Sequence, residues 1–366
     1  MIINNEIEIT SKIKNYTIVI VETISDLIES IKNVNTYYII DREVGNLYPD
    51  LVTHIDKNRI LYLISNEGLK TLSGSEMIFD FFIKNNINKK SKIIAIGGGV
   101  IQDVVTFATH VFHRGIEWVY VPTTLLAMSD SCIGAKSAIN YKGIKNPLGV
   151  FHPPKKILLY FNFVNTLKYS DLLSGYGEIL KLNIIGGKNS NILINNNHKG
   201  IECRKSNSLH ILKKLIKDSL LIKKKFIEKD EFDVGDRRIL NYGHTFGHAL
   251  ESALNNKIPH GIAVVIGIDI VNYISYRLGH LSKESFENYR NYYDKLYRNS
   301  FLRPFDFKYF LDRIRNDKKT TNGKVLLSLP KSSGIFFLKH VSIEGDLQLF
   351  FLDYIDEDNI FKIKLN

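Results

Sequence analysis

The sequence predicts an α/β protein whose first half forms a parallel β-sheet and whose second half is mainly α-helical. Short apolar runs alternate with helical segments up to about residue 160, a pattern typical of a parallel sheet covered on both faces. From about residue 165 onward the apolar spacing is that of helices. A length of 366 residues allows two domains, and we place them at 1–164 and 165–366.

The elements of the first half follow one another as β-α units. Segments 17–21 and 37–40 are predicted strands with a helix between them, and a strand over 59–65 precedes a helix over 76–86. The apolar segment 92–97 predicts a buried strand that ends in three glycines and continues as a helix. Segments 118–122 and 156–161 predict the last strands of this half.

The turn Gly97-Gly98-Gly99 lies between a strand end and a helix start, where parallel sheets bind phosphate groups. It does not follow the G-x-G-x-x-G pattern, so the ordinary dinucleotide fingerprint is absent. A tight βα turn and a phosphate-binding turn fit it equally well. Asp103, one turn into the helix, is placed either to reach a ribose or to favour the helix N-terminus.

Polar residues crowd together after strand 118–122. Thr123 and Thr124 offer hydroxyl groups at the strand end, and lysine and asparagine donors that suit phosphate oxygens follow. The residues are Asp130, Ser131, Lys136, Asn140, Lys145 and Asn146. Solvated loops usually carry such residues, but glycines and apolar residues surround these, which favours a lined pocket.

In the second half, Glu178 and Lys181 lie three residues apart on one helical face. They could form a surface ion pair, but leucine, isoleucine and glycine surround them. A buried carboxylate requires a cation or a metal. Further helices are predicted over 208–229, which contains Lys223, and over 261–279.

The remaining segments of the second half carry weaker signals. Residues 187–207 predict a loop, 283–316 are helical and basic, and 324–330 predict a strand. The tail over 334–366 alternates apolar and acidic residues, and we assign it no role.

The segment 237–251, RRILNYGHTFGHALE, has apolar residues spaced for a helix and carries two histidines four residues apart. At this spacing His244 and His248 leave the same helical face. His260 follows, and zinc accepts imidazole nitrogen and carboxylate oxygen. Histidine pairs at this spacing are more often surface or core residues, so the metal hypothesis depends on a distant carboxylate joining them.

The composition indicates which kinds of binding partner and which cellular location to expect. The net charge is +11, but the basic residues are scattered with no long basic tract, which argues against nucleic acid; a positive field would help collect an anionic small substrate. Cys132 and Cys203 make no disulfide framework. Neither a secretory signal nor an apolar run of about 20 residues is visible, so we expect a cytoplasmic protein with no membrane span.

Taken together, these motifs resemble those of the 3-dehydroquinate synthases, within the sugar-phosphate cyclase superfamily. The resemblance covers roughly residues 35–330. It rests on Gly97-Gly98-Gly99-Val100 with Asp103, Arg114-Gly115, Pro122-Thr123-Thr124, Asp130 through Lys136, Lys145-Asn146, Glu178 with Lys181, and Asn241-x-Gly-His244-Thr-x-Gly-His248 with His260-Gly261.

The resemblance implies a Rossmann-like NAD-binding domain, a mainly helical metal- and substrate-binding domain, an active site in the cleft and a homodimer. It also implies roles for single residues. Glu178, His244 and His260 would ligate a divalent metal, zinc or cobalt; Asp130, Lys181, Lys223 and His248 would surround the reacting hydroxyls. The phosphate would be held by Lys136, Asn146, Asn241 and one of Lys318 or Lys319, with Arg114 reaching in from a partner subunit, and Arg237 would meet the substrate carboxylate. NAD would contact Asp41, Glu67, Lys70, Gly98, Gly99, Val100, Asp103, Thr123, Thr124 and Lys145.

The implied reaction converts 3-deoxy-D-arabino-heptulosonate 7-phosphate to 3-dehydroquinate and phosphate. NAD transiently oxidises a ring hydroxyl, phosphate is eliminated, the ketone is reduced, and an aldol step closes the carbocycle. One alternative is a sister cyclase that uses a neutral sugar phosphate, of the 2-epi-5-epi-valiolone or 2-deoxy-scyllo-inosose synthase type. Others are a metal-dependent alcohol dehydrogenase of the glycerol dehydrogenase type, and a binding protein that retains NAD and metal.

The sequence departs from the family pattern at four positions. Gln102 and Ala135 replace glycines, Glu43 stands where asparagine often helps bind NAD, and Ile262 replaces the glutamate that usually follows His260-Gly261. The last change removes a polar partner beside an implied metal ligand. These departures bear on the substrate more than on the reaction class.

Overall fold

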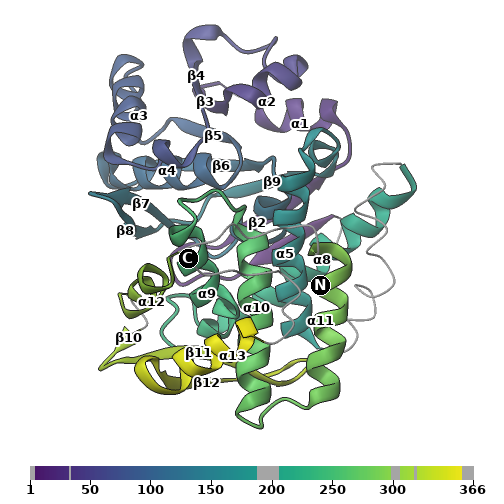
Figure 1. Cartoon of the computed structure of the whole chain (residues 1–366). Helices are drawn as coiled ribbons and strands as arrows, with labels where there is room; N and C mark the ends of the chain where they lie inside the picture. The colour runs from purple at the N-terminus through teal and green to yellow at the C-terminus, as the bar shows by residue number, and fades with distance from the viewer. Residues whose placement is uncertain (1–4, 33, 188–205, 298–305, 317–319, 357–366) are drawn as a thin grey trace. The chain divides into compact units, whose positions relative to one another are not determined.

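The computed structural model describes residues 5–32, 34–187, 206–297, 306–316 and 320–356 (Figure 1). The chain divides into two compact units, Met1–Lys168 and Tyr169–Asn366. The division falls after Lys168, where the sequence analysis placed it after residue 164.

A seven-stranded sheet forms the centre of the first unit, in the order β1-β2-β9-β6-β5-β3-β4. Neighbouring strands are parallel except for β1 and β2, so the predicted parallel sheet is confirmed and an antiparallel edge strand adds to it. The strands are β1 (Glu6–Ile9), β2 (Tyr16–Val21), β3 (Thr36–Asp41), β4 (Ile60–Leu63), β5 (Lys92–Gly97), β6 (Glu117–Pro122) and β9 (Lys156–Tyr160). The central strands β5 and β6 are almost entirely buried, as their continuous apolar sequences require.

Helices connect these strands. They are α1 (Ile24–Ile31), α2 (Arg42–Leu47), α3 (Leu72–Lys84) and α4 (Gly99–Val111). The polar stretch after β6 forms a π-helical turn (Ala127–Ser131) and then an antiparallel hairpin of β7 (Lys136–Tyr141) and β8 (Ile144–Phe151). This hairpin was not predicted from the sequence, because β8 is mostly exposed and neither strand has a continuous apolar pattern.

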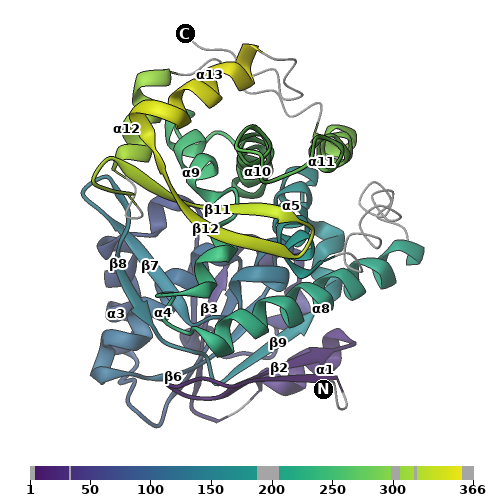
Figure 2. The same cartoon turned by 90° about the horizontal axis from the view of Figure 1, so that it is seen from below.

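The second unit is mainly helical, as predicted (Figure 2). Its helices are α5 (Tyr169–Gly186), α8 (Ser206–Lys229), α9 (His244–Ala253), α10 (His260–Arg277), α11 (Lys283–Tyr297), α12 (Phe307–Arg315) and α13 (Gln348–Asp356). A small antiparallel sheet joins β10 (Thr320–Thr321), β11 (Lys324–Ser332) and β12 (Ile335–Ser342). Both α5 and α10 are apolar on every side and are buried along most of their length.

Two segments of the second unit differ from the predictions. The segment 237–251 is not one helix: a 3₁₀ turn (Asp236–Asn241) precedes α9, and Gly243 between them has the left-handed φ of +78°. The described part of the tail that was left without a role forms β12, a π-helical turn (Ile343–Leu347) and α13. Most of the loop predicted over 187–207 lies outside the described residues.

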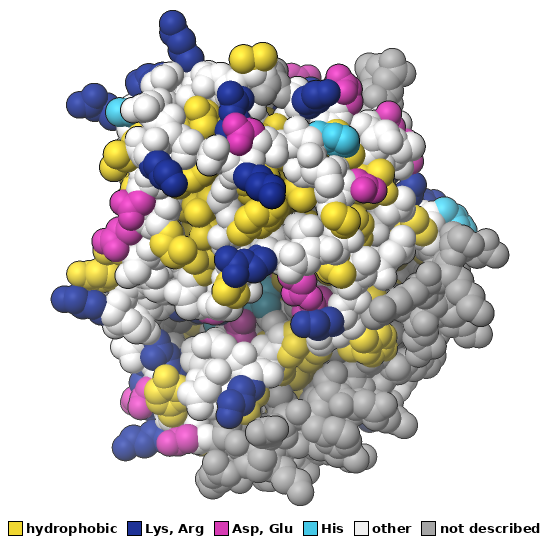
Figure 3. Space-filling view, turned by 90° about the horizontal axis from the view of Figure 1, so that it is seen from above, with side chains coloured by type: hydrophobic (Ala, Val, Ile, Leu, Met, Phe, Trp, Pro, Cys, Tyr) yellow, Lys and Arg dark blue, Asp and Glu magenta, His cyan; other side chains and the backbone are white. Residues whose placement is uncertain are grey.

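No helix among the described residues is long and apolar enough to cross a membrane. Lysine and arginine side chains are spread over the face drawn in Figure 3 and do not gather into one patch there.

Candidate active site

Three helices of the second unit bring a carboxylate and imidazoles together. Glu178 lies on α5 with 1% of its side chain exposed, and its Oε1 is 3.2 Å from Nε2 of His260 and 3.5 Å from Nε2 of His244. On its other side, Oε2 of Glu178 pairs with Nζ of Lys181 at 2.5 Å. The alternative of a surface ion pair for Glu178 and Lys181 is therefore wrong, because both side chains are buried.

The outer nitrogens of two imidazoles have partners that orient the rings. Nδ1 of His244 lies 3.2 Å from the Tyr242 carbonyl oxygen, and Nδ1 of His260 lies 3.2 Å from Oε1 of Glu251. Both Nε2 atoms are thereby directed toward Glu178, the arrangement in which histidine ligands usually hold a metal. Burial lowers the pKa of His260, but the carboxylates of Glu251 and Glu178 raise it to about 9.

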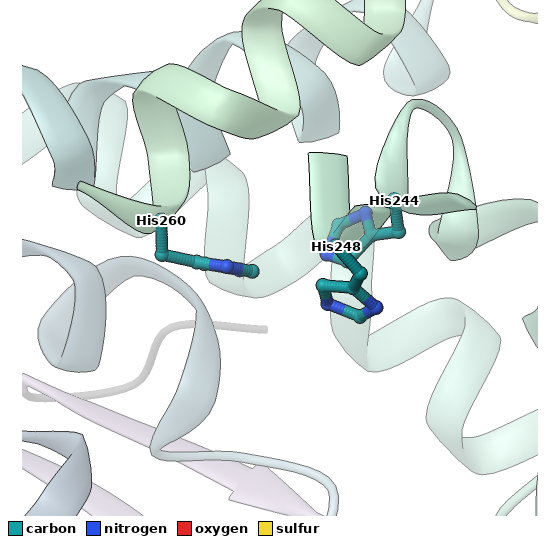
Figure 4. Close-up of side chains that lie close together, drawn as sticks. All are labelled: His244, His248 and His260. Carbon is teal, nitrogen blue, oxygen red and sulfur yellow. The ribbon is translucent and has the colours of Figure 1, made fainter. Parts of the chain in front are cut away.

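His248 joins this cluster. Within the described ranges, His244, His248 and His260 offer ring nitrogens that all lie within 4.8 Å of one another. His260 extends from the start of α10 toward the two histidines of α9 (Figure 4). Imidazole nitrogens next to a buried carboxylate form a donor set that suits zinc or cobalt. Glu178 with His244 and His260 is one possible ligand set, and the three histidines are another.

Close backbone packing holds these helices near one another. A Cβ added at Gly261 on α10 would lie 1.7 Å from the Ser174 carbonyl oxygen on α5. A Cβ added at Gly243, just before α9, would lie 2.6 Å from the Val264 carbonyl oxygen on α10. Glycine at these two positions therefore sets the spacing of the helices that carry Glu178 and the histidines.

The other predicted residues of the second unit lie on α8 and on the turn before α9. Lys223, on α8, is buried, and Arg237 and Asn241 lie on the 3₁₀ turn. Arg237 is only 4% exposed, and its Nη1 donates to the Glu231 carbonyl. Arg237 is therefore not a surface residue. Lys318 and Lys319 lie outside the described residues.

Asp230 shapes the segment that leads to Arg237. Its carboxylate accepts hydrogen bonds from the backbone N–H groups of Val234 at 3.0 Å, Gly235 at 2.7 Å and Arg237 at 3.0 Å. Burial would raise the pKa of Asp230, but these backbone donors outweigh it and hold the pKa below its ordinary value.

In the first unit, Gly97-Gly98-Gly99 and Asp41 lie at the carboxyl ends of the neighbouring strands β5 and β3. Since β4 lies beyond β3 while β6 and β9 lie beyond β5, the strand order reverses between β3 and β5, where parallel sheets bind ligands. A Cβ added at Gly98 would lie 2.8 Å from Cγ2 of Thr124, so the turn has no room for a side chain. Gly99 and Val100 begin α4, where backbone N–H groups have no partner within the helix.

A polar network next to this turn joins several predicted residues. Nζ of Lys70 lies 2.9 Å from Oδ2 of Asp103 and 3.7 Å from Oε1 of Glu67, and it donates to Oδ1 of Asn146 at 3.0 Å. Asn140 donates from Nδ2 to Oε1 of Glu67 at 3.0 Å and accepts from the backbone of Asn146 at 2.9 Å. Burial lowers the pKa of Lys70, but Asp103 and Glu67 raise it above its ordinary value.

The remaining predicted residues of this unit differ in exposure. Asp130 on the π-helical turn and Thr123 after β6 are buried, whereas Lys136 and Lys145 on the hairpin are exposed. Arg114 is also exposed and has a positive φ of 61°.

Glu251 was not among the predicted site residues, and the contact between Asn140 and Glu67 was not predicted either. Glu251 lies seven residues after His244 and three after His248, a spacing that places it on their helical face. That spacing was the available signal for Glu251. Nothing in the sequence pairs Asn140 with Glu67, because the contact depends on how the hairpin folds.

Comparison with known proteins gives the family. The model of the 3-dehydroquinate synthase N-terminal region matches residues 60–174, and that of the C-terminal region matches residues 175–320. The 3-dehydroquinate synthase of Clostridium tetani is 35% identical over 290 residues, which is 78% of this chain and 77% of that protein.

Two solved structures share the fold. The 2-epi-5-epi-valiolone synthase of Streptomyces hygroscopicus, with NAD+ and Zn2+ bound, matches with a TM-score of 0.80 and 22% identity over 94% of this chain and 97% of its own. A 2-deoxy-scyllo-inosose synthase, complexed with carbaglucose-6-phosphate, NAD+ and Co2+, matches with a TM-score of 0.81 and 20% identity over 98% of this chain and all, 100%, of its own. At these identities the likeness concerns the fold, whereas the two family models together span most of the sequence. The chain belongs to the 3-dehydroquinate synthase family.

Proposed function

We propose that the protein converts 3-deoxy-D-arabino-heptulosonate 7-phosphate to 3-dehydroquinate and phosphate, as a phosphate-eliminating lyase. The observation that supports this most directly is the buried Glu178 carboxylate, which faces His244 and His260 on one side and Lys181 on the other. A buried carboxylate among imidazoles is the expected environment for a divalent cation.

The metal would be zinc or cobalt, held by Glu178, His244 and His260 with His248 beside them. When bound, it supplies a Lewis acid that polarises a substrate hydroxyl. Lys181, whose ammonium already lies at 2.5 Å from Glu178, would face the same hydroxyl, together with Lys223 and His248. Asp130, in the first unit, would be a further proton-handling group.

NAD would bind at the reversal of strand order in the first unit. Backbone N–H groups of Gly98, Gly99 and Val100 suit a pyrophosphate, because the turn carries no side chain that blocks its approach. Asp41 at the end of β3 and the network around Lys70 and Asp103 would contact the riboses. Thr123, Thr124, Glu67 and Lys145 complete the proposed cofactor set. This assigns NAD to 1–164, and the metal with most of the groups proposed for the substrate to 165–366.

The substrate's charged groups need cations. Lys136, Asn146 and Asn241 would hold the phosphate with Lys318 or Lys319, and Arg114 would reach it from a second copy in a homodimer. Arg237 would meet the carboxylate, since a guanidinium fork binds a carboxylate bidentately. The substrate is therefore a small sugar phosphate. We expect no nucleic-acid or membrane partner and a cytoplasmic location.

The test is phosphate release by the metal-loaded protein with NAD. We expect rapid release from the keto acid phosphate and little from sedoheptulose 7-phosphate or glucose 6-phosphate, which lack a carboxylate. A preference for either neutral sugar phosphate would replace this proposal by the sister-cyclase function. Sedimentation of the purified protein would decide whether it is a dimer.

A further inference from the structure

We propose that Gln102 is a positioning residue that holds the π-helical turn Ala127–Ser131, and with it Asp130. Gln102 lies on α4 beside Asp103 and is 6% exposed. Its Nε2 donates to the Ser131 carbonyl at 2.7 Å, and Oγ of Ser131 donates to its Oε1 at 2.7 Å. One side-chain amide thus binds one residue of the turn through both of its polar ends.

Side chains hold this π-helical turn at both of its ends. π-helical turns are rare and recur at functional sites. Thr124 Oγ1 accepts from the backbone N–H of Ala127 at 3.3 Å at the start of the turn, and Ser131 ends it. Gln102 therefore holds the end at which Asp130 lies.

The pair also lies against the glycine turn. A Cβ built on Gly99 would be 3.9 Å from Oγ of Ser131. Gln102 belongs to the first turns of the helix that Gly99 begins, so the proposed NAD-binding turn and the segment with Asp130 share one hydrogen-bonded connection. A glycine, which the family pattern has at position 102, has no side chain with which to make it.

Asp130 is itself buried, so groups other than Gln102 and Ser131 also surround it. The alternative to positioning is a structural role, in which Gln102 and Ser131 satisfy one another's buried polar atoms and only stabilise the fold. The two roles predict different effects on kcat. If Gln102 positions Asp130, its removal misplaces a proton-handling carboxylate and lowers kcat even when the protein remains folded. If Gln102 is only structural, its removal lowers stability and leaves the kcat of the folded protein unchanged.

The experiment compares Gln102→Met, which keeps the volume and removes both hydrogen bonds, with Ser131→Ala and with the double variant. The control is Thr106→Val, a buried substitution on the same helix. In the wild type the Thr106 hydroxyl donates to the Gln102 backbone carbonyl at 2.6 Å.

The proposal rests on the proposed function, so wild-type phosphate release is measured first. For Gln102→Met we expect kcat to fall about tenfold with a change in KM of less than about threefold, and the double variant to be little worse than the more damaged single one.

Equal kcat in Gln102→Met and Thr106→Val would overturn the positioning role, whatever the loss in thermal stability. A second readout does not depend on the substrate. Hydrogen exchange of the backbone amides in 127–131 is expected to be faster in Gln102→Met than in Thr106→Val. If the wild type releases no phosphate, the proposed function fails, and unchanged exchange in 127–131 would then show that Gln102 does not hold the turn.

Discussion

Among single residues, Arg237 is the one that we propose distinguishes a keto acid substrate from a neutral one. It is buried in the second unit, and both its backbone N–H and its guanidinium make hydrogen bonds to the 230–231 segment. We expect Arg237→Ala to lower kcat/KM for the keto acid phosphate at least roughly thirtyfold, because a charge-assisted contact of about 2 kcal/mol is lost. Steady-state kinetics on a variant whose unfolding temperature has been checked would measure this.

The neighbouring Arg238 provides the matched control. Its Nε donates to the Asp233 carbonyl at 3.3 Å on a more exposed part of the same turn. Arg238→Ala should change kcat/KM by less than about threefold, since exposed polar contacts contribute little. Equal losses in the two variants would contradict a carboxylate-binding role for Arg237.

Glu251 is the second residue whose role can be tested alone. Its carboxylate orients His260 through the 3.2 Å contact with Nδ1, and it does so in a chain that has Ile262 where the family usually has a glutamate. Outer partners of this kind change metal affinity by about 10- to 100-fold. We expect Glu251→Gln to weaken zinc binding by that factor, measured by competition with a chelating dye. Glu287→Gln, at an exposed position on α11, should bind zinc as the wild type does.

At the scale of elements, the junction of α9 with α10 determines where His244 and His260 lie. Gly243 and Gly279 both have a positive φ, +78° and +72°, so alanine at either position adds left-handed strain of about 1–2 kcal/mol. An alanine Cβ at Gly243 would also lie 2.5 Å from Cγ1 of Ile268 and 2.6 Å from the Val264 carbonyl, whereas none of the described atoms lies within 4 Å of one at Gly279.

The comparison of Gly243→Ala with Gly279→Ala therefore isolates the effect of the close contacts that a Cβ would make at Gly243. In urea unfolding we expect Gly243→Ala to lose about 1–3 kcal/mol more than Gly279→Ala, because overpacking adds to the strain. Gly243→Ala should also bind zinc more weakly. Equal losses of stability would show that α9 can move away from α10 at no cost.

The turn built on Asp230 gives a prediction for pH. Its pKa is lowered in the folded protein, so the carboxylate stabilises the fold above the ordinary value of about 3.9, and this contribution disappears as the pH falls through the lower folded pKa. The difference in urea midpoint between wild type and Asp230→Asn should be largest near neutral pH and should shrink below about pH 4. A difference that does not change with pH would contradict this.

The elements differ in how far the sequence could predict them. Strands such as β5 and helices such as α10 have continuous apolar sequences and were predicted. The β7–β8 hairpin has one mostly exposed strand, β8, and the break before α9 depends on how Gly243 packs against α10. The residues of the site differ in the same way. The histidines and Glu178 could be named as candidates from their chemistry. The pairing of Gln102 with Ser131 could not be predicted, because it joins positions 29 apart in the chain.

For the whole molecule, the net charge of +11 fits an anionic small substrate better than a nucleic acid. In Figure 3 the basic side chains are spread over the face shown. The field of such a net charge would help collect the anionic sugar phosphate of the proposed reaction.

In the proposed reaction the first unit provides the NAD site and the second provides the metal site and most of the substrate groups, and the reaction is redox-neutral. When bound, NAD would take a hydride from the carbon that bears the reacting hydroxyl and return it to that carbon after phosphate has left, so the cofactor would be regenerated in every turnover. We expect protein stripped of NAD to be inactive, and a catalytic amount of NAD to restore release of many equivalents of phosphate with no accumulation of NADH. Phosphate and NADH would be followed in the same sample. NADH that rises in step with product would instead support the alcohol dehydrogenase alternative, in which the oxidised product leaves and the cofactor is a consumed co-substrate.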